Sequence, residues 1–137
     1  MRDNYERVQS AAYPYIFRKA VKSGESGVME IPLTSHGYIT NVMVNFVAGE
    51  NGTLRLRPYV ELPGEINQEL LKYAGENYVS GDNVKYDLPC YQEIENHSKL
   101  KLWYENTQTD PEAADSQIMV DIVCQYDSYV APRNIIG

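Results

Sequence analysis

The segment Thr53–Leu62 alternates between apolar and polar positions along its whole length. One set of alternate positions consists of Leu54, Leu56, Pro58, Val60 and Leu62. The positions between them hold Arg55, Arg57, Tyr59 and Glu61. Successive side chains of a strand point to opposite faces of the sheet, so this pattern predicts a half-buried β-strand with a polar, aromatic outer side.

The same alternation recurs along the chain and predicts the fold class. Further strands are expected over Tyr13–Val21, Val28–Leu33, Tyr38–Val47, Val84–Leu88, Lys99–Glu105 and Gln117–Tyr126. About seven or eight short strands separated by turn residues predict an all-β, antiparallel β-sandwich of jelly-roll-like type. Other sandwich topologies stay open, because pairing between distant strands leaves no local trace in a sequence.

Some local features refine this prediction. Tyr38–Val47 has apolar residues on both faces, with Thr40 in phase with Val42 and Ile39 on the opposite face, which is typical of a central strand. Asn51-Gly52 is a favoured hairpin pair and predicts that the strands on either side of it pair antiparallel.

One short helical insertion is expected near residues 66–74. Ile66, Leu70 and Tyr73 fall at helical spacing, and Gly75 follows as a C-terminal stop.

The chain of 137 residues is expected to form one domain over residues 13–131, with an N-terminal arm at 1–12 and a C-terminal tail at 132–137. No apolar run approaches the roughly 20 residues that a membrane-spanning helix needs. The N-terminus lacks the apolar core of a secretory signal. We therefore expect neither a signal peptide nor a membrane segment.

Net charge and tyrosine content narrow the partners. A net charge of −7 repels a phosphate backbone, so no nucleic-acid partner is expected. The 12 tyrosines fit β-strands, and tyrosine is also enriched where proteins contact one another. Some of them are therefore expected on contact surfaces.

The sequence offers little catalytic or metal-binding chemistry. Cys90 and Cys124 lack C-x-x-C spacing, and Cys124 lies in phase with the core positions of its strand. Reduced, buried thiols are predicted, with a disulfide open only if their strands are neighbours. His36 and His97 are too few for a typical zinc site and are expected in surface turns. We expect no enzyme activity, cofactor or metal.

The acidic segment Asp110–Asp115 offers the oxygen ligands that calcium prefers. It lacks the alternating Asp/Asn ladder and the central Gly of a calcium-binding loop. A solvated loop is the preferred interpretation.

The candidate interface residues lie on two predicted strands and at the chain ends. On the strands they are Arg55, Arg57, Tyr59 and Trp103, since Arg, Tyr and Trp are favoured at interfaces. The alternatives are plain surface residues for the Arg55, Arg57 and Tyr59 stripe and a core position for Trp103. At the ends the candidates are Tyr5, Ile135 and Ile136, for which fraying is the alternative.

In its short alternating strands, many tyrosines, acidic balance and terminal arms, the chain resembles the small β-sandwich virion proteins of tailed phages. The resemblance implies a capsid decoration or cement protein, or a head-fibre or tail component. Such a protein is non-enzymatic, self-associates as a homo-oligomer and binds other virion proteins, after assembly in the host cytoplasm. The second hypothesis is a carbohydrate- or receptor-binding module, in which Trp103 and the tyrosines stack on a glycan.

Overall fold

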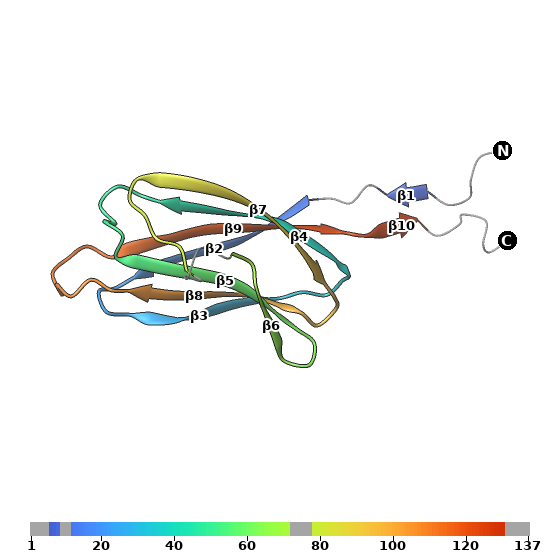
Figure 1. Cartoon of the computed structure of the whole chain (residues 1–137), viewed down its shortest axis with the longest axis horizontal. Helices are drawn as coiled ribbons and strands as arrows, with labels where there is room; N and C mark the ends of the chain where they lie inside the picture. The colour runs from blue at the N-terminus through green and yellow to red at the C-terminus, as the bar shows by residue number, and fades with distance from the viewer. Residues whose placement is uncertain (1–5, 9–11, 72–77, 131–137) are drawn as a thin grey trace.

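The computed structural model describes residues 6–8, 12–71 and 78–130 of the chain. These residues form two four-stranded antiparallel sheets packed face to face, with a further pair of short strands outside them (Figure 1). In chain order the strands are β1 (Glu6–Val8), β2 (Ala12–Val21), β3 (Ser26–Pro32), β4 (Gly37–Phe46), β5 (Leu54–Leu62), β6 (Ile66–Glu69), β7 (Val84–Ile94), β8 (Lys99–Asn106), β9 (Ser116–Tyr126) and β10 (Ser128–Val130).

The strand order identifies the sandwich as a jelly roll. One sheet has the order β2-β9-β4-β7 and the other β3-β8-β5-β6. The first and last strands of the sandwich therefore pair with each other, and strands inside them in sequence nest within this pair, as in two Greek keys. The predicted all-β, jelly-roll-like sandwich is confirmed, and the order of the strands resolves the topology that the sequence left open.

The core lies between the two sheets and is built from the alternate positions that the sequence marked as apolar. On β9, Ile118, Val120, Ile122 and Cys124 are at most 1% exposed. On β5, Leu54, Leu56 and Val60 are fully buried. Removing each such aliphatic side chain from water stabilises the fold by about 1.5–3 kcal/mol, so this double layer holds the sheets together.

Strand β4 is central in its sheet, as predicted, but its inward face changes phase once. Ile39 and Val42 are both fully buried. Their positions differ by three, whereas residues on one face of a regular strand differ by an even number. The register shifts between Ile39 and Asn41 against both neighbouring strands. Against β9, Thr40 is an extra residue on β4, whereas against β7 the extra residue lies on β7. Such a β-bulge changes which face the following residues occupy, so Ile39 and Val42 both face the core although simple alternation placed them on opposite faces.

The predicted hairpin across Asn51-Gly52 is also wrong. Strand β4 pairs with β7 and β9, whereas β5 pairs with β6 and β8 in the opposite sheet. Asn51 and Gly52 do adopt positive φ values of 51° and 72°, so the local turn forms. The connection Val47–Thr53 is, however, longer than a two-residue hairpin, and it carries the chain across the core so that the apolar faces of β4 and β5 oppose each other.

The predicted helix near 66–74 is wrong where the structure describes that segment. Residues Ile66–Glu69 form strand β6, which pairs with β5 from Leu62↔Ile66 to Tyr59↔Glu69. The edge of β5 offers unpaired backbone groups, and these overrode a helical spacing of only three apolar residues. Residues 72–77 lie outside the described part of the chain. The described residues contain no helix that is long and apolar enough to cross a membrane.

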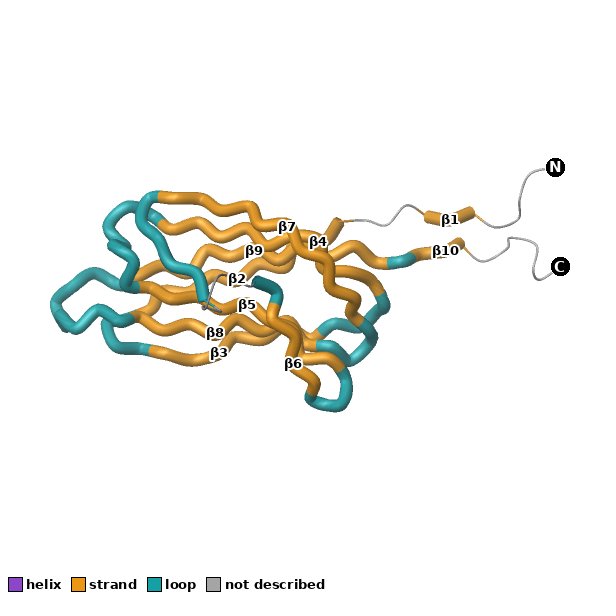
Figure 2. The backbone as a smooth tube through the Cα atoms, in the orientation of Figure 1, coloured by secondary structure: helices purple, strands orange, loops and turns teal. Residues whose placement is uncertain are grey.

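Strands β1 and β10 form a two-stranded antiparallel ladder, which we call the terminal ribbon. Its register runs from Glu6↔Val130 to Val8↔Ser128 and follows on from the β2–β9 pairing, which starts at Ala12↔Gln125. The ribbon extends from one end of the sandwich, away from both sheets (Figures 1 and 2). Part of the segment expected as an N-terminal arm is thus a paired strand.

Candidate functional site

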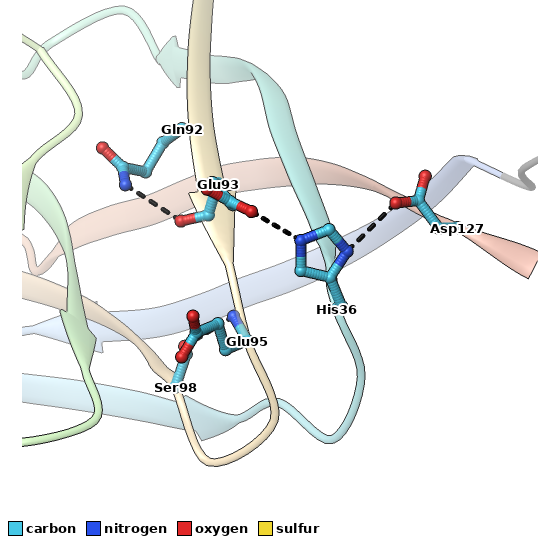
Figure 3. A network of polar contacts seen from close by, with 6 residues as sticks. All are labelled: His36, Gln92, Glu93, Glu95, Ser98 and Asp127. Atoms are coloured by element: carbon cyan, nitrogen blue, oxygen red, sulfur yellow. Dashed lines mark hydrogen bonds and ion pairs between the residues drawn. The ribbon is translucent and has the colours of Figure 1, made fainter.

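A network of polar contacts lies at the end of the sandwich from which the terminal ribbon leaves (Figure 3). It centres on His36, in the loop before β4. The next residue is Gly37, where a Cβ atom would lie 2.2 Å from the carbonyl oxygen of Gln125. Only glycine therefore allows the loop to approach β9 this closely. The backbone N–H of Asp127 in turn donates to the His36 carbonyl oxygen at 3.3 Å.

Both ring nitrogens of His36 contact carboxylates, and we call His36, Glu93 and Asp127 the histidine cluster. Nε2 lies 2.6 Å from Oε2 of Glu93, near the end of β7 (Figure 3). Nδ1 lies 3.0 Å from Oδ2 of Asp127, the residue between β9 and β10 (Figure 3). The hydrogen bond to Glu93, followed by that to Asp127, raises the pKa of His36. Only the imidazolium form donates from both nitrogens at once, so the geometry favours the charged ring.

Tyrosines flank the histidine cluster. Tyr38 and Tyr91 stack with their ring centroids 4.7 Å apart, and His36 meets Tyr38 edge-on at 5.6 Å. The pKa of Tyr38 is raised, chiefly by its hydrogen bond with Tyr91. Tyr91 is nevertheless 75% exposed. Its ring is a flat apolar surface open to solvent, stacked on the tyrosine that meets His36.

A second group of tyrosines lies on the strand pair that leads into the ribbon. The hydroxyl groups of Tyr15 and Tyr126 are hydrogen-bonded to each other, and the rings of Tyr13 and Tyr126 meet edge-on with centroids 5.8 Å apart. Burial, more than the contact with Tyr15, raises the pKa of Tyr126. Tyr13 is 53% exposed, so this group also presents an aromatic ring to solvent.

A cleft of about 220 Å³ adjoins the histidine cluster. It is lined by Leu62, Pro63, Ile66, Gln92, Glu93 and Glu95. Ile66 is 52% exposed, and Glu93 belongs to both the cleft and the cluster. The carboxylates and the amide of the cleft can accept hydrogen bonds from hydroxyl groups, and the exposed ring of Tyr91, two positions before Glu93, can stack on a ring. The arrangement thus suits the binding of a ligand that carries a ring and hydroxyl groups.

The other histidine, His97, lies in the turn between β7 and β8. It adopts a positive φ of 74°, and the turn is closed by a hydrogen bond from the backbone N–H of Glu95 to Oγ of Ser98 at 3.0 Å (Figure 3). Both histidines are exposed in turns, as the sequence predicted. The described residues include no group of three or more His, Cys, Asp or Glu side chains placed to hold a metal ion.

The structure brings the predicted interface residues of β5 and β8 to one outer sheet face. Arg57 is the register neighbour of Trp103, and Leu100 and Leu102 are fully buried on the other side of β8. Trp103 therefore points outward and is partly exposed. Tyr59 shares this face, but only 8% of its surface is exposed.

The two arginines of this face already have partners. Arg57 forms an ion pair with Glu69 and lies over the ring of Tyr59, with 4.6 Å between its guanidinium carbon and the ring centroid. Arg55 lies 3.5 Å from Glu105 and 4.8 Å from the ring centroid of Tyr78. Much of the predicted contact stripe is thus satisfied within the chain. Tyr5, Ile135 and Ile136 lie outside the described residues.

Cys90 and Cys124 are both free thiols. They belong to β7 and β9, and β4 lies between these strands in the sheet. The condition for a disulfide, neighbouring strands, is not met. Burial raises the pKa of Cys90 to about 11 and that of Cys124 to about 12, so both are protonated thiols near neutral pH.

Comparisons with known proteins give a structural likeness only. No protein-family model matches the sequence, and no curated protein matches it. Among solved structures, a chain of infectious bursal disease virus, Gt strain, aligns with a TM-score of 0.48 and 11% identity, over 92% of this chain and 32% of that one. A chain of the Gx strain aligns with a TM-score of 0.43 and 15% identity, over 93% of this chain and 34% of that one. The chain thus spans about a third of the length of these two chains.

Proposed function

We propose that this chain is a non-enzymatic structural protein of a virion, a capsid decoration or cement protein of the tailed-phage type that self-associates and binds the shell. The observation that carries the proposal is the terminal ribbon. Among the described strands, β1 and β10 pair only with each other. Each therefore has one edge of backbone donors and acceptors without a strand partner.

An isolated two-stranded ladder is marginally stable in water, because it has no facing layer to bury its side chains. Unpaired strand edges also recruit further strands. A ribbon that extends from the sandwich is therefore suited to dock on a second copy of the chain or on a shell subunit. The histidine cluster lies at its base, where it holds Asp127, the residue that joins β9 to β10.

The jelly roll is compatible with this role, since viral capsid domains, lectins and cupins all use it. A fold does not determine a function, so the sandwich alone does not choose among them. In the proposed function, the sandwich is the rigid body and the ribbon makes the intersubunit contact.

The oligomeric state of the full-length chain tests the self-association. Tyr129→Pro removes one backbone donor of the ribbon, either toward its register neighbour Arg7 or at the outer edge, whereas Tyr129→Ala keeps every backbone donor. By light scattering, we expect the unmodified chain and Tyr129→Ala to form a dimer or higher oligomer, and Tyr129→Pro to have the mass of a monomer. If the unmodified chain stays monomeric at high concentration, the result contradicts self-association. Mass spectrometry of purified virions tests the location.

Carbohydrate or receptor binding is the second candidate function, and the exposure of Tyr91 favours it. Its ring is 75% exposed, held by stacking on Tyr38, and close to Glu93 in sequence. Exposed aromatic rings beside hydrogen-bonding groups suit sugar rings. On a glycan array we expect Tyr91→Ala to lose binding and Tyr13→Ala to keep it. Trp103 fluorescence reports separately on a glycan bound to the other sheet face.

A further inference from the structure

We propose that the end of the sandwich opposite the terminal ribbon binds a hard divalent cation, Ca²⁺. The site lies in the pocket between the β4–β5 connection and the β8–β9 loop, two loops that Figure 1 shows at the far end from β1 and β10. This inference does not depend on the proposed virion role.

The central group is the carboxylate of Glu50. Glu50 is 4% exposed and lines the pocket. Its Oε1 accepts a hydrogen bond from the backbone N–H of Gln117 at 3.0 Å, whereas its Oε2 is buried without a hydrogen-bond partner. The Glu50 carbonyl oxygen accepts hydrogen bonds from the backbone N–H and the Oγ1 of Thr53, at 3.0 and 2.8 Å. The residue is thus held firmly in place.

An ionised carboxylate that leaves water is strongly disfavoured unless a charge or several hydrogen bonds compensate it. Glu50 has one such hydrogen bond, and no cationic side chain forms an ion pair with it within the described part of the chain. None of the residues that line the pocket is Lys, Arg or His. A bound cation would supply the missing compensation.

A second acidic residue, the exposed Asp115, lines the same pocket. The pocket holds about 170 Å³ and is lined by Val47, Ala48, Gly49, Glu50, Thr53, Gln108, Ala113, Ala114, Asp115 and Ser116. Nearby, Oδ1 of Asp82 accepts hydrogen bonds from the backbone N–H groups of Gly49 and Asn51, at 2.8 and 3.2 Å, on either side of Glu50. The local charge is therefore negative.

The donor set selects the kind of cation. The pocket offers carboxylate, hydroxyl and carbonyl oxygens and no imidazole or thiolate, which favours Ca²⁺ over zinc or copper. The volume leaves room for an ion with several waters, which would complete the coordination that two carboxylates begin. Ca²⁺ tolerates such irregular geometry better than Mg²⁺ does. With so few charged ligands, we expect a dissociation constant of about 0.1–1 mM, as in extracellular calcium modules.

This site differs from the calcium loop that the acidic segment failed to match. Within that segment, Oδ1 of Asp110 accepts the backbone N–H of Glu112, and Glu112 itself is exposed. Only Asp115 of its acidic residues lines the pocket. The second carboxylate comes from Glu50, far away in sequence, so no linear motif marks the site.

The test compares four full-length proteins after removal of metals with EDTA: unmodified chain, Glu50→Gln, Asp115→Asn and, as a matched control in the same loop, Glu112→Gln. Melting temperature is measured without metal, in 10 mM CaCl₂ and in 10 mM MgCl₂, and calorimetry gives the stoichiometry for CaCl₂. For a dissociation constant of about 1 mM, CaCl₂ should raise the melting temperature of the unmodified chain and of Glu112→Gln by roughly 4–7 °C.

The proposal requires one Ca²⁺ per chain, a smaller shift in MgCl₂, no CaCl₂ shift in Glu50→Gln and about a tenfold weaker dissociation constant in Asp115→Asn. If Glu50→Gln does not fold, Asp115→Asn and the comparison of the two metals decide. Absence of binding heat and of a shift in the unmodified chain would overturn the proposal. Two results together would overturn it as well: a CaCl₂ shift in Asp115→Asn equal to that of the unmodified chain, and a MgCl₂ shift in the unmodified chain equal to its CaCl₂ shift. They would indicate general screening of negative charge.

Discussion

Nδ1 of His36 lies 3.0 Å from Oδ2 of Asp127, and the backbone N–H of Asp127 donates to the carbonyl oxygen of His36 at 3.3 Å. These two contacts join the loop before β4 to the residue that separates β9 from β10. Because Glu93 occupies the other ring nitrogen, the same imidazole also holds the end of β7. One histidine therefore links three segments at the base of the terminal ribbon.

This link should make stability depend on pH. The pKa of His36 is raised above its ordinary value of 6.5, so the stabilisation is fully present below pH 6.5 and is lost as the pH rises through the higher folded-state value. We expect the melting temperature of the unmodified chain to fall relative to that of His36→Gln between about pH 6 and pH 8, in line with this linkage. Thermal unfolding monitored by circular dichroism over this range measures the difference.

His97 provides the control, since it is exposed in a turn and has a positive φ that Asn tolerates. His97→Asn should follow the unmodified chain at every pH. The ring resonances of His36, titrated by NMR, should give a pKa above the ordinary value of 6.5. Parallel melting curves for the unmodified chain and His36→Gln over the whole range would contradict the role assigned to the cluster.

The two arginines of the outer sheet face should differ in their effect on stability. The Arg57 and Glu69 side chains are 28% and 24% exposed, and Oε2 of Glu69 is buried without a hydrogen-bond partner. Removing Arg57 leaves this carboxylate uncompensated, so Arg57→Ala should lower the free energy of unfolding by about 1–3 kcal/mol. Arg55 and Glu105 are 41% and 39% exposed at 3.5 Å, so Arg55→Ala should cost less than about 1 kcal/mol. Urea denaturation measures both.

Equal losses for the two variants would show that burial does not distinguish the pairs. The comparison also decides how the proposed contact face is tested. Tyr59 is 8% exposed, so Tyr59→Ala removes packing as well as any contact. Arg55 and Trp103 are the residues whose replacement probes assembly with less disturbance of the fold.

Replacing Asn106, the last residue of β8, should strongly lower the stability of the fold. Asn106 is 1% exposed, and its Nδ2 donates to the Val21 carbonyl oxygen at 3.1 Å and to Oγ of Ser116 at 3.3 Å. Its Oδ1 accepts the backbone N–H of Gln108 at 3.0 Å. Asn106→Leu leaves these groups unpaired, and the free energy of unfolding should fall by about 2–4 kcal/mol in urea.

Ser116→Ala serves as the matched control, because it removes only one acceptor of Asn106 and should lower the free energy of unfolding by about 1 kcal/mol. If Asn106→Leu and Ser116→Ala have the same free energy of unfolding, the other hydrogen bonds of the Asn106 amide do not stabilise the fold.

The sequence predicted what depends on neighbouring residues and missed what depends on distant ones. Alternation located the strands and identified Ile118, Val120, Ile122 and Cys124 as core, because the period of a strand is local. It did not predict that β4 and β5 belong to different sheets, since their turn residues are compatible with either arrangement. The bulge at Thr40 likewise depends on register with two other strands.

The candidate sites could not be predicted from the sequence for the same reason. His36 is separated from Glu93 by 57 positions and from Asp127 by 91, so no motif joins them. The burial of Tyr59 was missed because alternation assigns a residue to a face but does not show what packs against that face. The outward position of Trp103 was one of two alternatives that alternation left open, and the burial of Leu100 and Leu102 beside it decides between them.

The two cysteines should stay reduced and react slowly in the folded protein. Strand β4 separates their strands, and neighbouring strands lie about 4.8 Å apart, so the two Cα atoms are roughly 9–10 Å apart. A disulfide needs a separation below about 7 Å. Burial also raises the pKa of Cys90 to about 11 and that of Cys124 to about 12, which leaves little reactive thiolate at pH 8.

We therefore expect a thiol reagent such as Ellman's reagent to modify both cysteines slowly in the folded protein. In urea, where the protein is unfolded, both should react quickly. Cys90, which is partly exposed, should react before the fully buried Cys124, and Cys90→Ser should remove the faster phase. Intact mass and melting temperature should be the same with and without reductant. A mass lower by about two hydrogens without reductant would contradict the strand order, because only a rearranged sheet brings the two sulfurs within bonding distance.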